Sequence, residues 1–453
     1  MSSDAVAELG RVLGPKVVTD PDLTAPWSRD QSPIADVGTP LAVVRATSVE
    51  DVVATLRTAT AHGVPVVTRG AGSGLAGGAN ASDGCILLSV AGMDRILSVD
   101  PARRTATVQP GVINADLGRA AAEHGLRYTP DPGSRDISSI GGNIATNAGG
   151  MTCCKYGVTA DHVAALTAVL PDGTVVRTGG ATRKNVTGLD LTSLLIGSEG
   201  TLAVVVEATV WLKPVTEDES TLVAMFATVD AAVQAVVATT ARTTPSAMEL
   251  MDRTTIAAVN AMTGMDIDAD AEAVLLITCD GPAASAEAAV CEEVAAAHGA
   301  TEVFRTDDRA EGAELMNARR MALPALEKQG SILLDDVGVP VGLLPDMVAA
   351  IAKIAAEHDV TVGTFGHAAD GNLHPTLIYD PADDAERERA RQAFAAIVRA
   401  AIDLGGTVSG EHGIGSLKLP FVPEMYGDAE IALMHRVKAA FDPDGLMNPG
   451  RGY

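Results

Sequence analysis

The sequence predicts an α+β fold divided between two domains. Its 453 residues exceed the usual size of one domain, and 47% of them are apolar, which is enough for two cores. Short apolar runs bounded by Gly, Pro and Asp dominate the first 215 residues, as is typical of strands. After Pro214 and the acidic stretch 216–220, long alanine-rich helical segments alternate with isolated strands. We therefore place the first domain at 1–217 and begin the second at 218.

In the first domain, helical spacing over Ser48–His62 and Asn114–His124 ends each time at a glycine, Gly63 and Gly125, as helix C-termini prefer. The apolar runs around these helices predict strands. The expected strands are Leu41–Val44, Val64–Val67, Cys85–Val90, Thr105–Val108, Ala165–Leu170 and Thr201–Trp211.

The second domain shows amphipathic helical periodicity with few strands between the helices. The expected helices are Val229–Thr240, Ala283–His298, Leu344–His358 and Ala385–Leu404, and the expected strands include Ala273–Thr278 and Thr361–Phe365. Such a succession predicts helices that cover one antiparallel sheet.

Composition excludes several classes of protein. The formal net charge of −25, without any basic stripe, repels phosphates and excludes nucleic acid as a partner. No apolar run reaches the roughly 18 residues of a membrane-spanning helix. The N-terminus lacks the basic and apolar segments of an export signal, so we expect a cytoplasmic protein, with peripheral contact at the inner membrane face left open.

The five cysteines are an odd number without zinc-ribbon spacing, which fits reduced thiols in the cytosol. Adjacent Cys153 and Cys154 permit a redox role, but free cysteine more often serves as a small buried hydrophobe.

The glycine-rich stretch 69–78 follows an expected strand and contains the dinucleotide pattern Gly-x-Gly-x-x-Gly. A Rossmann loop opens a helix, whereas this one runs through a turn at 79–84 into another strand, which excludes that site. Glycines still allow successive backbone N–H groups to converge on an anion such as a pyrophosphate. The alternative interpretation is a flexible turn.

Two further small-residue segments favour the anion site. The stretch 132–150 combines Gly, Ala and Ser so that a flat ring has room beside the backbone, and Ser138 or Ser139 is placed to cap a short helix. The segment 197–202 supplies more backbone donors just before a strand.

In their order along residues 35–215, the three segments resemble the FAD-binding domain of the vanillyl-alcohol oxidase and p-cresol methylhydroxylase flavoprotein family. The resemblance implies a two-part FAD-binding domain in which the first segment holds the pyrophosphate, the second lines the isoalloxazine and ribityl groups, and the third meets the adenine side. Some members attach FAD through a histidine of the first loop, and since this loop has none we expect non-covalent FAD. The implied FAD contacts are Arg69, Gly70, Ala71, Gly72, Ser73, Gly74, Leu75, Gly77, Gly78, Pro132, Gly133, Ser139, Gly142, Asn143, Thr146, Asn147, Gly149, Gly200 and Val205.

In the second domain, Gly366–Pro375 lies between two apolar runs and has Asp370-Gly371 at its centre, which predicts a hairpin. With a two-residue turn, His367 opposes His374, and both imidazoles leave the same face about 5 Å apart at Cβ. A longer loop would shift this register. Such a pair is able to hold one metal ion, and the alternative is two loop histidines satisfied by hydrogen bonds.

A second segment, Gly405–Gly415, places Glu411 beside His412 between glycines. Two imidazoles and a carboxylate with open positions suit a catalytic divalent ion, with Zn²⁺ or Mn²⁺ favoured.

The motifs Gly-His-x-x-Asp-Gly-Asn-x-His and Gly-Glu-His-Gly resemble those in the C-terminal, substrate-binding cap domain of FAD-linked D-lactate, glycolate and D-2-hydroxyglutarate dehydrogenases. The resemblance implies that His367, His374 and Glu411 bind the metal, that His412 is the catalytic base, and that Asn372 touches substrate. It also implies a cap domain at 218–440 and a tail at 441–453 that returns to the FAD domain and includes Asn448, a further candidate for substrate contact.

These features predict FAD-dependent oxidation of a small D-2-hydroxy acid, D-lactate or glycolate, to the 2-oxo acid. The metal would lower the pKa of the hydroxyl, His412 would take its proton, and the hydride would pass to flavin N5. An arginine should hold the carboxylate, and Arg319 is favoured over Arg320, although either is also compatible with an exposed helix charge.

The sequence leaves alternatives open. D-2-hydroxyglutarate would require a second cation, for which Lys155 or Arg320 is available. A non-catalytic flavin subunit of a larger oxidase and a flavin-free zinc hydrolase are the other classes, but the second leaves the glycine-rich segments unexplained. The electron acceptor, a quinone or an electron-transfer protein, and a homodimeric state are also left open.

Overall fold

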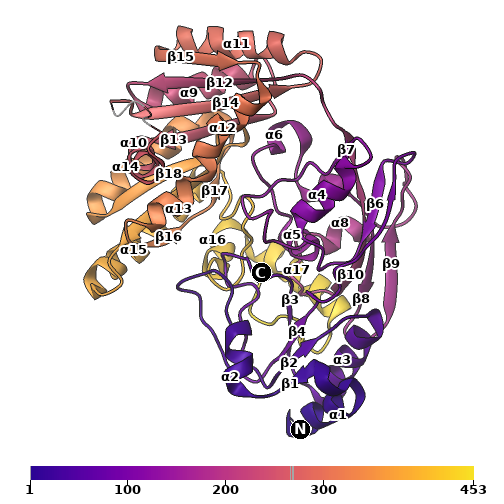
Figure 1. Cartoon of the computed structure of the whole chain (residues 1–453). Helices are drawn as coiled ribbons and strands as arrows, with labels where there is room; N and C mark the ends of the chain where they lie inside the picture. Colours follow the sequence, from indigo (N-terminus) through magenta and orange to yellow (C-terminus); the bar gives the residue numbers. More distant parts are fainter. Residues whose placement is uncertain (1, 266, 268–269) are drawn as a thin grey trace. The chain divides into compact units, whose positions relative to one another are not determined.

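The computed structural model describes residues 2–265, 267 and 270–453. Within it the chain forms two compact units. The first unit comprises residues 1–149, 157–215 and 411–453, and the second comprises residues 150–156 and 216–410. From the sequence we expected the returning tail at 441–453, whereas the contacts group the chain with the first unit from Glu411 onward. Figure 1 labels the helices and strands of both units and colours them along the sequence.

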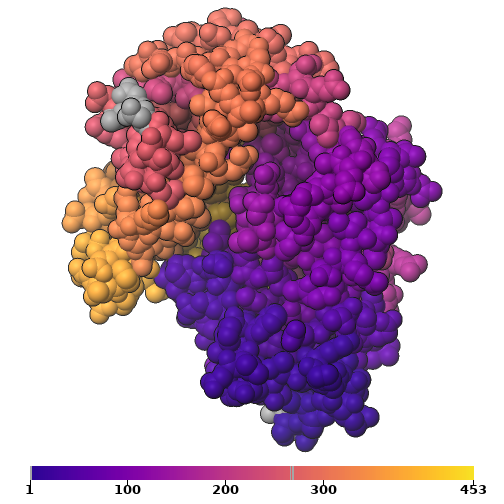
Figure 2. Space-filling model, in the orientation of Figure 1, coloured from indigo at the N-terminus to yellow at the C-terminus, as the bar shows by residue number. Residues whose placement is uncertain are grey.

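A small four-stranded sheet carries the first glycine-rich segment. Its order is β1 (Val17–Val18), β2 (Ala42–Arg45), β4 (Ile86–Ser89) and β3 (Val66–Arg69), with β2 and β3 parallel to β4. Helix α3 (Val49–His62) links β2 to β3; it starts at a capping box formed by Ser48 and Asp51 and ends at left-handed Gly63. No helix lies between β3 and β4, as expected from the turn-forming residues after the glycines. In Figure 2 this N-terminal part is indigo.

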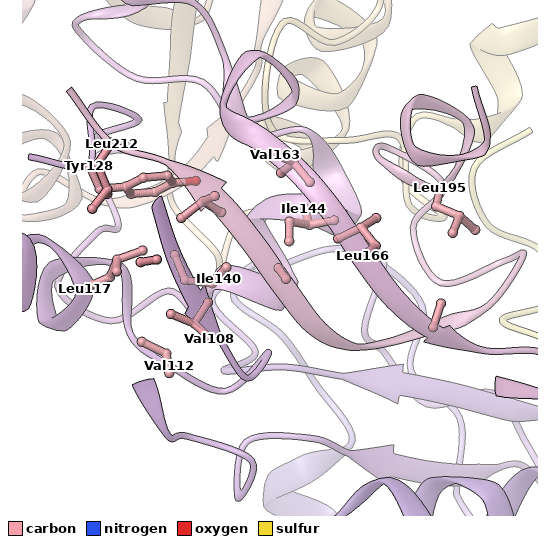
Figure 3. Packing of buried hydrophobic residues seen from close by; sticks show 14 of the residues in the cluster. Val108, Val112, Leu117, Tyr128, Ile140, Ile144, Val163, Leu166, Leu195 and Leu212 are labelled. Carbon is pink, nitrogen blue, oxygen red and sulfur yellow. The ribbon is translucent and has the colours of Figure 1, made fainter. Parts of the chain in front are cut away.

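The second sheet of this unit is antiparallel, with the order β5 (Ile96–Asp100), β6 (Thr105–Val108), β10 (Val204–Trp211), β8 (Val163–Val169) and β9 (Val175–Gly179). Its apolar face packs against α4 (Asn114–Ala122) and α5 (Ile140–Thr146). Figure 3 shows Ile140 and Ile144 of α5 among the buried side chains. Burial of these two residues fixes the orientation of α5, and hence of the segment 132–150.

The remaining elements of the first unit are short helices, a two-stranded ribbon and the helices of the returning segment. They are α1 (Ser2–Leu13), α2 (Pro21–Thr24), α7 (Thr159–His162), α8 (Leu191–Leu195), α16 (Val422–Met425), α17 (Asp428–Phe441), β7 (Leu126–Arg127), β11 (Lys213–Pro214) and the 3-10 turns Gly14–Lys16, Ala25–Trp27 and Leu419–Phe421.

The second unit is built on one antiparallel sheet, as predicted. Its strands are β15 (Ala300–Thr306), β12 (Glu219–Phe226), β14 (Ala273–Asp280), β13 (Ala247–Asp252), β18 (Thr361–His367), β19 (Asn372–Tyr379) and β16 (Ser331–Leu334) in that order, and β17 (Val337–Gly338) also pairs with β19. The α+β fold class is therefore confirmed.

Helices cover both faces of this sheet (Figure 1). One group comprises α9 (Val229–Thr240), α11 (Ala284–Ala297), α14 (Leu344–His358) and α15 (Asp384–Asp403), and the other comprises α10 (Arg253–Thr263), α12 (Arg309–Arg320) and α13 (Ala322–Glu327). The unit also contains α6 (Cys153–Tyr156) and 3-10 turns at Val341–Leu343 and Ala368–Asp370. Among the helices of the described residues, none combines the length and apolar character needed to cross a bilayer.

Candidate functional site

The first unit brings the three glycine-rich segments together around α5 and its N-cap residue, Ser139. The Ser139 hydroxyl caps α5 by accepting from the backbone N–H of Gly142 at 3.4 Å, and it also accepts from Ala71 N–H at 3.3 Å. A Cβ on Gly70 would lie 2.5 Å from this hydroxyl, so the close approach requires glycine. The third segment follows through Glu199 N–H, which donates to the Ala145 carbonyl of α5 at 2.9 Å. The predicted cap by Ser138 or Ser139 is thus made by Ser139.

The C-terminal segment forms hydrogen bonds with the same loops. The Asn448 side-chain amide donates to the Gly78 carbonyl at 3.0 Å and to the Glu199 carbonyl at 2.6 Å. Arg451 Nε donates to the Gly77 carbonyl at 2.9 Å. Both N–H groups of the Asn448 amide are thereby used, which leaves its Oδ1 as the atom available to a ligand.

Buried charges surround the first glycine-rich loop. Arg69 is 8% exposed, and among the described residues its Nη1 has no hydrogen-bond partner. Gly72 has a φ of +77°, and a Cβ there would overlap the Arg69 guanidinium, so this glycine lets the arginine lie across the loop. Burial raises the pKa of nearby Asp30, while the charge of Arg69 acts to lower it. A buried guanidinium N–H beside a glycine loop fits a phosphate oxygen of FAD.

Glu199 is a buried carboxylate that the sequence did not single out. Its two oxygens accept from the backbone N–H groups of Ile414 at 2.7 Å and Gly415 at 2.8 Å. Burial raises its pKa, and these two hydrogen bonds act in the opposite direction. Glu199 therefore ties the returning segment to the third glycine-rich loop.

Some predicted FAD contacts use their side chains to support the fold. Asn143 is 4% exposed, accepts from Asn114 at 3.0 Å and donates to Ser138 at 3.2 Å. Asn147 ends α5 in the left-handed conformation with φ of +52° and accepts from Ala160 N–H at 2.8 Å. Any contact of these asparagines with a flavin therefore has to come from their remaining polar or backbone atoms.

The other predicted FAD contacts lie around these elements. Thr146 is the last residue of α5, Gly200 has a left-handed backbone near the Thr68 side chain, and Val205 lies on β10. The remaining positions are in loops of the first unit: Ser73, Gly74, Leu75, Pro132, Gly133 and Gly149.

In the second unit the histidine hairpin has a different register from the one expected. Ala368–Asp370 forms a 3-10 turn and Gly371 follows with φ of +73°, so the loop has four residues rather than two. His367 therefore pairs with Asn372, and His374 pairs with Phe365. The observed strand register differs from the expected one by an even number of positions, so both imidazoles still share one face of the sheet. Their ring centroids are 5.1 Å apart.

That face also carries a carboxylate and an arginine. Glu249 on β13 is directly opposite His367 on β18, and Glu249 Oε1 lies 2.8 Å from His367 Nδ1. Glu249 Oε2 lies 2.7 Å from Arg319 Nε of α12 as an ion pair, although the N–H direction does not satisfy hydrogen-bond geometry. The Arg319 guanidinium also lies 4.4 Å from the centre of the Phe365 ring.

The Glu249 carboxylate is fully buried among these groups. Burial acts to raise its pKa, but the neighbouring His367 and Arg319 charges outweigh burial and leave the pKa below its usual value. By contrast Arg320, the other candidate, is exposed. The structure therefore brings together His367, His374 and Arg319.

A second buried carboxylate, Asp336, lies next to the hairpin, in the short segment between β16 and β17. Asp336 accepts from the Asn372 amide at 2.7 Å and from the Ser409 hydroxyl at 2.7 Å, and its Oδ1 is 3.6 Å from His374 Nδ1. Asn372, a predicted substrate contact, is thereby held at its amide nitrogen.

Glu411 and His412 belong to the first unit, where His412 Nε2 is 3.7 Å from Glu411 Oε1. The residues just after them pack on the glycine-rich segments of that unit. A Cβ on Gly413 would lie 3.1 Å from the Thr146 methyl, and Ser416 N–H donates to the Ala76 carbonyl at 3.1 Å.

Sequence reasoning missed Glu249, Asp335 and Asp336. Each had a signal, because Glu249 is a lone carboxylate inside the apolar run Ala247–Met251, and the two aspartates separate apolar runs. Charged side chains inside buried strands are rare without a partner.

Comparison with known families agrees with this two-part arrangement. Residues 40–179 match the model of an FAD binding domain, and residues 215–451 match the C-terminal domain of FAD linked oxidases. These matches define the class of protein as an FAD-linked oxidoreductase.

Sequence similarity to known proteins extends over the whole length of the chain. The glycolate oxidase subunit GlcD of Bacillus subtilis (strain 168) is 41% identical, covering 100% of this chain and 97% of the relative. The D-lactate dehydrogenase of Anaerostipes hadrus is 32% identical, covering 100% and 97%. A crystal structure of p-cresol methylhydroxylase with substrate bound shares the fold, with a TM-score of 0.82 at 19% identity, covering 99% of this chain and 96% of that one. The chain belongs to the family of FAD-linked oxidases.

Proposed function

We propose that this flavoprotein oxidises a small D-2-hydroxy acid, D-lactate or glycolate, to the 2-oxo acid. Relatives named glycolate oxidase subunit and D-lactate dehydrogenase support the substrate class. The observation that carries the proposal is the arrangement of the second unit, in which two imidazoles, a buried carboxylate and an arginine share one face of the sheet.

We assign His367 and His374 as ligands of a divalent ion, with Glu411 as the third. Two imidazoles that share a tetrahedral ion at N–metal distances of about 2.0–2.1 Å have ring centres about 5 Å apart. The observed separation of 5.1 Å fits this requirement. Glu249 is a hydrogen-bonding partner of His367 of the kind that metal-bound histidines commonly have, and the Asp336 carboxylate lies 3.6 Å from Nδ1 of His374.

The connectivity of the chain supports the roles of Glu411 and His412. Gly410, in the second unit, packs so closely against Asn372 that a Cβ would overlap its side chain. Gly413, in the first unit, packs against Thr146 at the end of α5. Only Glu411 and His412 separate these two glycines in the sequence.

In the proposed reaction His412 takes the hydroxyl proton, which requires a neutral imidazole. A bound divalent ion would lower the pKa of the hydroxyl. Bound FAD would supply the acceptor for the hydride that leaves Cα. The protein's own contribution is to fix the substrate so that the hydroxyl meets His412 and Cα meets the ring.

Arg319 is suited to hold the substrate carboxylate. Glu249 and Phe365 fix one side of its guanidinium, and among the described residues its Nη atoms make no hydrogen bond. A fixed planar fork of this kind binds a carboxylate bidentately. Lys155, considered for a second carboxylate, is engaged by Asp280 at 2.9 Å, which favours a monocarboxylate over D-2-hydroxyglutarate.

For the route of the electrons, we propose a quinone or an electron-transfer protein as acceptor. The relatives from Bacillus subtilis and Escherichia coli are both named as oxidase subunits, which supports transfer within a larger assembly.

The test is anaerobic bleaching of the flavin absorbance by D-lactate and by glycolate. His412→Ala should nearly abolish bleaching with FAD still bound, and His374→Ala should lose both metal and bleaching. His298, whose ring pairs with a backbone carbonyl at the end of α11, provides the control, since His298→Ala should behave as the wild type. Unchanged bleaching in His412→Ala removes its role as base, and no bleaching of the wild type by any 2-hydroxy acid refutes the proposed function.

A further inference from the structure

Glu249 joins two residues that the proposed function assigns to different tasks. One oxygen faces Nδ1 of His367 at 2.8 Å, and the other faces Nε of Arg319 at 2.7 Å. His367 is a proposed metal ligand, and Arg319 is the proposed clamp for the substrate carboxylate. A single carboxylate therefore contacts both.

Glu249 and both of its partners are buried. Glu249 is 0% exposed, His367 is 5% and Arg319 is 7% exposed. A carboxylate removed from water in this way needs partners for both oxygens, because burying a charge without compensation is strongly unfavourable. The two contacts meet that need, and neither oxygen can turn away without leaving a buried N–H group without its partner.

The contact with His367 also selects its tautomer. A carboxylate accepts hydrogen bonds only, so His367 must carry its proton on Nδ1, and the lone pair of the neutral ring is then on Nε2. The opposite tautomer would place two lone pairs against each other.

We propose that Glu249 is a positioning residue that fixes His367 as an Nε2 metal ligand and at the same time anchors Arg319. The substrate hydroxyl at the metal and the substrate carboxylate at the arginine are thereby held in a set relation by one side chain. The metal and substrate parts of this inference rest on the proposed function, whereas the tautomer of His367 does not.

Two variants separate the charge of Glu249 from its acceptor oxygen. Glu249→Gln keeps an acceptor and loses the charge. The double variant Glu249→Leu/Arg319→Met removes the acceptor together with its ion-pair partner, so that no charge is left buried alone. Asp280→Asn is the matched control, because Asp280 is a buried carboxylate at the end of a neighbouring strand that pairs with Lys155 instead.

The first measurement is Zn²⁺ or Mn²⁺ affinity of the FAD-loaded protein, by competition with a chromophoric chelator. The double variant should bind metal roughly 10–100-fold more weakly, as expected when the partner of a metal-bound histidine is lost. Glu249→Gln should fall between it and the wild type, and Asp280→Asn should match the wild type. Wild-type affinity in the double variant overturns the proposal.

The second measurement is the tautomer of His367 in the metal-free protein, from NMR of ¹⁵N-histidine-labelled samples at alkaline pH, with His367→Gln to assign the signal. The wild type should carry the proton on Nδ1, Glu249→Gln should retain it there, and the double variant should lose the preference. An Nε2 proton in the wild type overturns the proposal. If the wild type takes up no metal, the proposed metal site fails, and the tautomer still decides the role of Glu249.

Discussion

Replacing Ser139 by alanine tests whether the glycine-rich loops act as one FAD site. The Ser139 hydroxyl makes two contacts, the α5 cap to Gly142 N–H at 3.4 Å and the link to Ala71 N–H at 3.3 Å. Loss of a cap costs about 0.5–2 kcal/mol, and loss of one further hydrogen bond costs about 0.5–1.5 kcal/mol. Both distances are long, so we expect values at the lower end and a total of about 1–2 kcal/mol.

If this energy organises the site, it should appear in FAD binding. A loss of about 1–2 kcal/mol corresponds to a roughly 5–30-fold weaker affinity, measured by titrating FAD into the apoprotein and following flavin fluorescence. Thr228→Ala is the control, because Thr228 caps α9 in the other unit with a single contact to Ala231 N–H at 3.1 Å. It should lower stability by a similar amount and leave FAD affinity unchanged. Equal FAD affinities of the two variants would refute the reasoning.

Two predictions concern the second unit. Gly371→Ala and Gly405→Ala each place an alanine at a left-handed φ, +73° and +72°, which costs roughly 1–2 kcal/mol of stability. Only the methyl group added at position 371 overlaps the Val339 carbonyl, which should add about 1–3 kcal/mol to the loss measured by denaturant unfolding and weaken metal binding. Equal losses in the two variants would contradict the close approach. Burial raises the pKa of Asp252 to about 6, so the folded state favours the protonated carboxyl and stability falls as the pH rises from 4 towards 7. The stability of Asp252→Asn relative to the wild type should therefore rise by up to about 3 kcal/mol across this range. A constant difference between the two proteins would exclude the effect.

Local patterns in the sequence predicted the long helices well. The expected helices Val229–Thr240 and Leu344–His358 coincide with α9 and α14 at both ends. Their apolar spacing is strong, Thr228 caps the first, and Asp359 closes the second in the left-handed conformation. Strands such as β13 and β16 were not predicted, because a short apolar run does not distinguish a buried strand from a helix.

Spatial contacts within the candidate site were predictable only where the residues lie close in the sequence. His367 and His374 flank one turn, so their common face follows from strand alternation even though the loop length was wrong. The contact of Glu249 with His367 spans 118 positions and exists because β13 lies beside β18 in the sheet. Strand order of this kind is a property of the whole sheet and is not encoded in any local motif.

The charges beneath α12 are better explained by chemistry than by stability. Replacing a buried ion pair with apolar side chains of similar volume is often neutral, or stabilising by about 1–4 kcal/mol, so Glu249 and Arg319 are not needed to hold α12 on the sheet. The apolar contacts of Met316 and Ala318 with the same face already do this. A charged pair that adds little to folding, but directs one histidine and presents one guanidinium, is expected where an anionic substrate and a cation must be held together.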